Sequence, residues 1–563
     1  MKPQTAVIRS AAILALSFVI MQPLRAQQPR SAPPSDDRAS CRGLLDIPNL
    51  TILSADIVPS KGHTPEYCHV TGLIPPGIHW HMQLPLPSKW NGRLLNVGNG
   101  GKAGNMVYAD NRLAEGYAVA NSNTGHDNGA EPNSSFAFDN EQEAIDFGWR
   151  AVHLTANASK TLVVGYYGKA QKYAYWEGCS TGGRQGMMEL QRFPADFDGV
   201  VVGSPVIDYA RLNAAHIWSL KALMENHYAG DLAYDINHNG HYDSLTKLNI
   251  LRDAVLAKCD AKDGIKDGII DNPLACDFNP DRDLADKMCP ADKDGDACFT
   301  KAQIQTIKDL YSGPRDSKGN KIFKGLMFGS ESQWSRNIVP YGGNNFAPSN
   351  LGYEIDHANY LFYPQAKGVP PANIKDISSN LNKTAVFPEY AWWEFNFDDF
   401  PAGKLAPMMQ IFDATDPDLT RALSQKKAKV LIYQGWEDGD AYPTMILDYY
   451  KQMVNTTFKG NMDAAQEDAR LFMAPGMGHC GGGPGPNEWD KLPPLADWVE
   501  NGKAPQFIVA EHRSNNVNAP ANAAVDDQRK LCPYPQHAVY VGPAGGQNDA
   551  KNWIAANFAC KAE

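Results

Sequence analysis

The chain has 563 residues, of which 43% are hydrophobic and 20% are charged, so it can form a large core and two or more folding units. Aromatic residues make up 10% of the chain, which excludes a disordered or low-complexity protein. The formal net charge of -11 argues against the basic surface that binds nucleic acid, so we expect no nucleic-acid partner.

Residues 1–26 are predicted to be a secretory signal peptide. Lys2 and Arg9 precede an apolar run, and the small residue Ala26 stands at the expected cleavage point. The run is shorter than the ~20 apolar residues of a membrane span, and no second run of that length follows. We therefore expect a soluble protein, secreted or periplasmic, with no membrane contact after cleavage; an uncleaved anchor is the alternative.

Several short apolar runs end in Gly-rich turns, as buried parallel strands do at the C-terminal edge of a sheet. These runs are Arg93–Val97, Tyr173–Trp176, Gly199–Val202, Lys429–Tyr433 and Leu471–Met473. Helical stretches such as Gly186–Arg192 lie between some of them. The alternation predicts an α/β fold with its core divided between residues 27–205 and 427–563.

Residues 206–426 differ from both flanking parts. Strands are hard to find there, polar residues and Pro dominate, and four of the ten cysteines fall in this region. A segment of this length between core strands is better explained as an inserted domain than as a loop. We expect an α/β-hydrolase core with a large inserted lid domain that covers the active site.

The segment Gly178-Cys179-Ser180-Thr181-Gly182 matches G-x-S-x-G, the nucleophile elbow of α/β-hydrolases. In this motif a strained strand-to-helix turn presents the serine hydroxyl at a helix N-terminus, where developing negative charge is favoured. An ordinary Gly-rich turn produces the same short pattern. Here a Tyr/Trp-rich strand precedes it and a helix-compatible stretch follows, so Ser180 is the candidate nucleophile.

A serine nucleophile needs a base, and the base needs an acid that orients it. In this fold the chain order is Ser, then the acid, then His. Asp438 lies in the turn after one predicted strand, and His479 lies in a Gly-rich loop after a later one. Glu437 and Asp440 compete with Asp438 for the acid role. A surface histidine is the alternative for His479.

The tetrahedral intermediate of acyl transfer needs preorganised N–H donors. We expect one at the backbone of Thr181 and the other in the loop Gly98–Gly101, with Gly101 as the candidate. A phosphate-binding loop is the alternative for such a glycine run. The loop lacks both the Walker lysine pattern and a G-x-G-x-x-G match.

An even number of cysteines in an exported protein predicts disulfides. Metal binding is the alternative, but the sequence has no C-x-x-C pair that would indicate a metal site. Spacing along the chain favours the pairs Cys41–Cys68, Cys259–Cys276, Cys289–Cys298 and Cys532–Cys560. Cys179 and Cys480 remain, although sequence alone does not prove the connectivity. A bridge between these two would tether the nucleophile loop to the loop of His479.

The Cys-Ser, Asp and His-Cys arrangement resembles the tannase and feruloyl esterase family, over nearly the whole mature chain. The resemblance implies Ser180 as nucleophile, Asp438 as acid, His479 as base and a Cys179–Cys480 disulfide. The other four cysteine pairs also resemble those of the family. One departure is Gln434, where relatives often have His. It lies outside the triad, so we expect it to affect local packing more than chemistry.

The segment Cys259–Asp271 has carboxylates spaced along a Gly-bearing loop, a pattern that suits the oxygen ligands of Ca²⁺. A solvated acidic turn is the alternative. The segment resembles the calcium loop of the same family, which implies a structural Ca²⁺ and no organic cofactor. The implied ligands are the side chains of Asp260, Asp263 and Asp267 and the carbonyls of Ile265 and Ile269. Acidic stretches at Asp235 and Asp292 are candidates for a second site.

The predicted function is that of a secreted serine esterase acting by two-step acyl transfer. The resemblance implies a small-molecule ester of an aromatic acid, such as a hydroxycinnamic or gallic acid. Activity of the mono(2-hydroxyethyl) terephthalate hydrolase type, a secreted peptidase and a non-catalytic calcium-stabilised binding protein are the alternatives. Aromatic residues of the insertion are candidates to stack on such a substrate or to form the core of the insertion: Tyr390, Trp392, Trp393, Phe395 and Phe397. The oligomeric state is left open.

Overall fold

The computed structural model of the chain describes residues 37–127, 134–137, 140–342, 348–362, 395–400, 405–513 and 523–562. The predicted signal peptide lies outside these ranges, as do Tyr390, Trp392 and Trp393. Within the described ranges, no helix is both long enough and apolar enough to cross a membrane.

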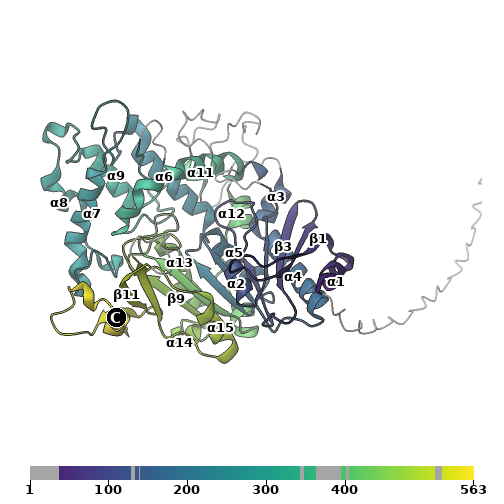
Figure 1. The fold of residues 1–563 in the computed structure, drawn as a ribbon. Helices are drawn as coiled ribbons and strands as arrows, with labels where there is room; N and C mark the ends of the chain where they lie inside the picture. The colour runs from purple at the N-terminus through teal and green to yellow at the C-terminus, as the bar shows by residue number, and fades with distance from the viewer. Residues whose placement is uncertain are drawn as a thin grey trace, which may run out of the picture.

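A nine-stranded sheet forms the centre of the molecule, in the order β1-β2-β3-β5-β4-β6-β7-β8-β9 (Figure 1). Its strands are β1 Thr51–Val58, β2 Tyr67–Ile74, β3 Ile78–Pro85, β4 Arg93–Val97, β5 Ala118–Ser122, β6 Tyr173–Cys179, β7 Gly199–Gly203, β8 Lys429–Gly435 and β9 Ala469–Ala474. The pairs from β1 to β5 are antiparallel, whereas all pairs from β5 to β9 are parallel. All five predicted strands belong to the parallel part, so the α/β prediction is confirmed.

Helices flank the sheet and extend through the inserted region. The longer ones are α4 Ala151–Tyr167, α5 Thr181–Arg192, α6 Tyr209–Tyr228, α7 Thr246–Cys259, α9 Lys301–Ser312, α11 Ser349–His357, α13 Pro443–Phe458 and α15 Leu492–Asn501. The shorter ones are α1 Asp37–Arg42, α2 Asp110–Ala114, α3 Glu141–Ile145, α8 Pro280–Asp283, α10 Trp334–Asn337, α12 Ala406–Phe412 and α14 Met462–Gln466. The helix predicted at Gly186–Arg192 is the second half of α5.

The sheet buries alternate residues of one strand on its two faces. On β7, Val200 and Val202 pack in the same hydrophobic cluster as Met187 of α5. Val201, between them, packs in a different cluster with Trp498 of α15. Helices therefore cover both faces, and the carboxyl ends of the parallel strands are left to carry the functional loops.

The chain between β7 and β8 contributes no strand to the central sheet in the residues that the structure describes. Helices α6, α7, α8, α9 and α11 of this region occupy the upper part of the view, from its left edge to the centre, and α6 contacts both α9 and α11 (Figure 1). Phe395 and Phe400 pack with Ala214 and Ile217 of α6 in a separate hydrophobic cluster. These contacts agree with an inserted region at 206–426, whose limits stay a prediction.

Two antiparallel strand pairs end the chain. They are β10 Ile508–Arg513 with β11 Val525–Leu531, and β12 His537–Tyr540 with β13 Phe558–Lys561. The side chain of Arg529 on β11 is buried and contacts carboxylates of the inserted region. The C-terminal part therefore packs against the insertion as well as the core.

All ten cysteines form disulfides, in the pairs that the sequence favoured. The pairs are Cys41–Cys68, Cys179–Cys480, Cys259–Cys276, Cys289–Cys298 and Cys532–Cys560. Four of these bridges are local, whereas Cys179–Cys480 spans 301 residues. It joins the end of β6 to the loop that follows β9.

Candidate active site

Ser180 lies at the turn between β6 and α5, where the sequence predicts the nucleophile elbow. Its backbone has φ 61° and ψ -123°, a conformation that non-glycine residues rarely adopt. The Ser180 N–H donates to the Gly203 carbonyl (2.9 Å), and the Arg184 N–H donates to the Ser180 carbonyl (3.0 Å). These bonds hold the strained turn, which places Ser180 at the N-terminus of α5.

The elbow leaves no room for side chains at two glycines. A Cβ atom on Gly178 would lie 2.5 Å from the carbonyl oxygen of Gly182, and one on Gly98 would lie 2.6 Å from the Cα atom of Gly182. The G-x-S-x-G pattern and the Gly-rich loop after β4 therefore have one physical cause. The backbones of β6, α5 and this loop approach one another too closely for a Cβ atom.

His479 and Asp438 form the contact that the triad requires. His479 Nδ1 lies 2.9 Å from Asp438 Oδ2 and 3.1 Å from Oδ1. Asp438 is fully buried, and its Oδ1 accepts hydrogen bonds from the backbone N–H groups of Asp440 (2.9 Å) and Ala441 (2.7 Å). The carboxylate is thus oriented toward the imidazole by the turn in which it lies.

The two competing carboxylates have other partners. Glu437 accepts a hydrogen bond from the Ser332 hydroxyl (2.8 Å), and burial raises its pKa to about 8. Asp440 Oδ2 accepts from Asn337 Nδ2 (2.7 Å). Of the three acidic residues in this turn, Asp438 makes the hydrogen bond to His479.

Gln434 contacts the acid directly, which the sequence did not predict. Its Nε2 donates to Asp438 Oδ2 (2.9 Å) and to the Ala441 carbonyl (3.0 Å). Its Oε1 is buried and has no hydrogen-bond partner among the described residues. Because Nε2 faces acceptors, the surroundings fix the orientation of the amide. The position of Gln434 at the end of β8, in the strand that leads to the Asp438 turn, was the available signal.

A cavity of about 600 Å³ brings the predicted residues together. Ser180, His479, Thr181 and Gly101 all line it. The inserted region supplies the opposite wall, through Tyr209, Leu212, Asn213 and His216 of α6, Asn337 of α10, and Asn350 and Tyr353 of α11. The insertion is therefore part of the cavity, as a lid domain would be.

The aromatic residues predicted for the cavity wall have a different place where they are described. Phe395 is 3% exposed and packs in the hydrophobic cluster of α6. Phe397 packs edge-on against Trp218, with 5.3 Å between the ring centroids. Both belong to the core of the insertion, which was the alternative explanation for them.

His216 is a residue of the cavity wall that the sequence analysis missed. Its Nδ1 lies 2.9 Å from Glu354 Oε1, and its Nε2 lies 3.0 Å from the Asp440 carbonyl oxygen. Burial opposes the charged form, but the hydrogen bond and charge of Glu354 outweigh it and raise the pKa of His216. No local motif marks this residue, because its partners come from distant parts of the chain.

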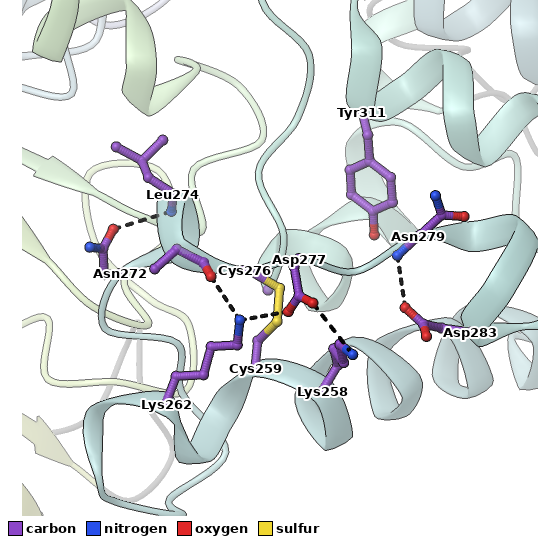
Figure 2. Close-up of a disulfide and its surroundings, with 12 residues drawn as sticks. Lys258, Cys259, Lys262, Asn272, Leu274, Cys276, Asp277, Asn279, Asp283 and Tyr311 are labelled. Carbon is purple, nitrogen blue, oxygen red and sulfur yellow. Dashed lines mark hydrogen bonds and ion pairs between the residues drawn. A yellow bond between two sulfur atoms is a disulfide. The ribbon is translucent and has the colours of Figure 1, made fainter.

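The predicted calcium loop follows α7 and is closed by a disulfide. Beside Cys259–Cys276, Lys262 Nζ donates to the Ala275 carbonyl (2.8 Å) and to Asp277 (2.6 Å), which ties the two ends of the loop together (Figure 2). Asp260 accepts hydrogen bonds from the backbone N–H groups of residues 267 and 268, both at 3.2 Å. The backbone of the loop is therefore held in part by hydrogen bonds to one of its own carboxylates.

The loop has more carboxylates than positively charged groups that pair with them. Asp267 and Asp271 both bind the guanidinium of Arg529, at 2.5 and 2.7 Å. Asp263 Oδ2 is buried without a hydrogen-bond partner among the described residues, and burial raises the pKa of this carboxyl to about 8. The side chains of Asp260, Asp263 and Asp267 do not bring their oxygens within 4.8 Å of one another. The loop nevertheless suits a bound cation. Its carboxylates share a single guanidinium, that of Arg529, and the buried Oδ2 of Asp263 lacks a hydrogen-bond partner among the described residues.

The other acidic stretches bind the donors of the chain itself. Asp235 accepts from the N–H groups of Asn239 (3.1 Å) and Gly240 (2.7 Å). Asp294, in the stretch that begins at Asp292, pairs with Lys247 Nζ (2.6 Å). A second calcium site stays a prediction to which these contacts add no support.

Two other groups of described residues have the composition of a metal site: one is Asp438, Asp440 and His479 of the cavity region, and the other lies apart from it. His153, Glu189 and Asp196 bring ligand atoms within 4.8 Å of one another. His153 Nδ1 lies 2.6 Å from Asp196, and Lys160 Nζ lies 2.8 Å from the other oxygen of the same carboxylate. Lys160 and His153 satisfy Asp196, whereas both carboxyl oxygens of Glu189 are buried without a hydrogen-bond partner among the described residues.

Comparisons with known proteins agree with the geometry. The family model described as tannase and feruloyl esterase matches residues 63–556. An uncharacterized esterase of Xanthomonas campestris pv. campestris is 31% identical over 92% of this chain and 91% of its own length. The mono(2-hydroxyethyl) terephthalate hydrolase of Piscinibacter sakaiensis is 29% identical over 94% of this chain and 92% of its own length.

A solved structure has the same fold. The feruloyl esterase B of Aspergillus oryzae superimposes with a TM-score of 0.74, over 93% of this chain and 100% of the other, at 24% sequence identity. The predicted α/β-hydrolase fold with a large inserted region is confirmed at the level of the fold.

The contact between Gln434 and Asp438 predicts a change in the pH dependence of ester hydrolysis. Gln434→Leu removes a donor to the carboxylate, which leaves Asp438 freer to stabilise the protonated form of His479. We expect kcat/KM to fall about 10- to 100-fold, because a hydrogen bond to a charged group is worth about 1.5–3 kcal/mol. The acid limb of the pH–rate profile should move to higher pH, measured with a chromogenic acetate ester.

Gln434→His is the matched control, because histidine retains an N–H donor at this position. It should keep a profile close to that of the parent protein. A folded Gln434→Leu variant with an unchanged profile and unchanged kcat/KM would show that Gln434 serves packing alone.

Proposed function

The chain belongs to the tannase and feruloyl esterase family and is a carboxylic ester hydrolase, and we propose that it cleaves esters of aromatic acids by a serine mechanism. One observation carries the mechanism: Ser180, on a strained elbow, shares a cavity with His479, whose Nδ1 is bonded to the buried carboxylate of Asp438. The family match supports the substrate class.

The proposed reaction has two acyl-transfer steps. Ser180 Oγ attacks the ester carbonyl while His479 Nε2 accepts its proton, and Asp438 stabilises the imidazolium through the Nδ1–H bond. The imidazolium then gives its proton to the departing alcohol, which leaves an acyl-serine. Water attacks this ester, with His479 again taking a proton and returning it to Ser180 Oγ as the acid leaves. The N–H groups of Thr181 and Gly101 would bind the oxyanion in both steps.

The substrate class is proposed from the family and from the cavity wall. Tyr209, Tyr353, Asn213 and Asn337 are among the residues that line the cavity. Such a wall suits a planar acyl group with hydroxyl substituents, as in hydroxycinnamic or gallic acid. Hydrolysis of a terephthalate monoester is the second candidate, because a hydrolase of that class aligns with 94% of this chain.

We propose export to the periplasm or the medium. The predicted signal peptide and the five disulfides support this location, since disulfides persist in oxidising compartments.

A structural Ca²⁺ in the loop between Cys259 and Cys276 is also proposed. The side chains of Asp260, Asp263 and Asp267 and the carbonyls of Ile265 and Ile269 would hold it. The buried, unsatisfied oxygen of Asp263 supports this assignment. Bound there, the ion would balance the carboxylates and stabilise the insertion, while the catalytic steps need only the residues of the cavity.

Initial rates on methyl ferulate, methyl gallate and mono(2-hydroxyethyl) terephthalate test the proposed function. We expect turnover of at least one of these esters and a loss of at least about 1,000-fold in kcat for Ser180→Ala, because the nucleophile is removed. The thermal midpoint of Ser180→Ala should stay close to that of the parent. Persistent turnover in the folded Ser180→Ala variant would contradict the serine mechanism. Absence of turnover on all three esters would move the substrate outside this class.

Removal of calcium should destabilise the protein. Chelation with EGTA should lower the thermal midpoint by about 2–5 °C, and Ca²⁺ but not Mg²⁺ should restore it. Asp263→Asn should abolish this response, whereas the matched variant Asp235→Asn, in a turn whose carboxylate bonds its own backbone, should keep it. A parent protein that holds no calcium by elemental analysis and melts identically with EGTA would refute the site.

A further inference from the structure

Three buried amides meet at the loop after β4, here called the glycine loop (residues 98–107). Asn99 lies in this loop, Asn121 near the end of β5, and Gln185 in α5. Each is at most 3% exposed. They lie outside the proposed triad, yet the glycine loop they contact supplies Gly100 and Gly101 to the cavity.

Asn121 joins the end of β4 to both ends of the glycine loop. Its Nδ2 donates to the Val97 carbonyl (2.7 Å) and to Asn99 Oδ1 (3.0 Å), and its Oδ1 accepts from the Val107 N–H (2.7 Å). Because Nδ2 faces two acceptors and Oδ1 faces a donor, the backbone dictates how this amide is oriented.

Asn99 extends the connection to the nucleophile helix. Its Nδ2 donates to the carbonyls of Asn105 (2.9 Å) and Ser122 (3.1 Å), and its backbone N–H donates to Gln185 Oε1 (3.1 Å). Gln185 belongs to α5, the helix that begins directly after Ser180. This bond therefore links the glycine loop to the element that carries the nucleophile.

The polar contacts of Gln185 are confined to this link. Its Nε2 is buried without a hydrogen-bond partner among the described residues. The bond through Oε1 to the Asn99 N–H is thus the polar contact that the structure records for this side chain. The unpaired Nε2 group of Gln185 lowers the stability of the folded protein, because a buried polar group without a partner is costly. The hydrogen bond at the other end of the amide is therefore expected to serve a role other than stability.

We propose that Asn99, Asn121 and Gln185 are positioning residues that hold the glycine loop at the distance from α5 that the oxyanion requires. An oxyanion donor acts within about 2.7–3.1 Å of the developing charge, and a misplacement of about 1 Å costs up to about 100-fold in rate. The glycines of the loop have no side chain that could anchor it, so the amides at its base fix its position relative to α5, while Lys102 binds the loop to α11. The inference rests on the proposed serine mechanism.

Gln185→Met tests the link, because it keeps the length of the side chain and removes the acceptor of the Asn99 N–H. With 4-nitrophenyl acetate as substrate, we expect kcat to fall about 10- to 100-fold and KM to change by less than about twofold. The inhibition constant of phenylboronic acid should rise by a similar factor. In that adduct Ser180 Oγ bonds to boron, its proton passes to His479, and the anionic tetrahedral boronate depends on the oxyanion donors.

Gln191→Met is the matched control. Gln191 is also on α5, but its Nε2 donates to the Ala414 carbonyl (2.8 Å) and to the Tyr449 hydroxyl (3.1 Å), away from the glycine loop. It should lower the thermal midpoint more than Gln185→Met does and leave kcat and the boronate inhibition constant near the parent values.

The second variant, Asn121→Ser, removes the bonds to Val97 and Asn99 and should show the same split between kcat and KM. Circular dichroism and thermal melting establish that each variant is folded. A folded Gln185→Met or Asn121→Ser with parent-like kcat and boronate inhibition would overturn the positioning role, as would a rise in KM at constant kcat. Turnover that persists in Ser180→Ala would instead contradict the serine mechanism itself, so the two failures are distinguishable.

Discussion

The close approach of three backbone segments is the constraint on which the active site depends. The end of β6, the first turn of α5 and the glycine loop meet where Gly98 and Gly178 have no space for a Cβ atom and Gly182 has little. Trp176 Nε1 donates to the Gly182 carbonyl (3.0 Å), which fixes the first turn of the helix to the strand before it. As a result, Ser180, the first residue of α5 and the glycines at positions 100 and 101 line the same cavity, close to the positive end of the α5 dipole.

The loop of His479 depends on the buried carboxylate of Asp438, which is aligned by its hydrogen-bond donors. Burial of Asp438 without partners would be costly, but His479, Gln434 and two backbone N–H groups all donate to it. The Cys179–Cys480 bridge adds a covalent tie between the residue before Ser180 and the residue after His479. His479 therefore keeps its place relative to both Asp438 and Ser180, although the three come from strands β6, β8 and β9 and their loops.

The elements that local sequence determines were predictable. The strand ends, the sharp turn at Ser180, the turn that carries Asp438 and the loop of His479 are each encoded by a few consecutive residues with a clear physical requirement. The pairing of the cysteines also followed from spacing, since four of the five bridges are local.

Contacts between distant segments were not predictable from one sequence. Arg529 and Asp267 form an ion pair although they are 262 residues apart in the sequence, and His216 and Glu354 are hydrogen-bonded at a separation of 138 residues. Gln434 and Asp438 are near in sequence, but only the fold of the turn shows that the amide faces the carboxylate rather than the core. The same holds for Phe395 and Phe397, because composition does not distinguish a cavity wall from the interior of the insertion.

The inserted region is bound to the catalytic loops as well as covering them. Lys102, directly after the proposed oxyanion glycine, is fully buried and donates from Nζ to the Tyr353 carbonyl of α11 (2.8 Å). His216 of α6 bonds both Glu354 of α11 and the carbonyl of Asp440 in the acid turn. A substitution in α6 or α11 thus changes the cavity wall directly and, through these two buried contacts, the loops that carry the donors and the acid. Since the insertion supplies much of the cavity wall, it is the part of the chain where the shape of the cavity can change while Ser180, Asp438 and His479 stay in place.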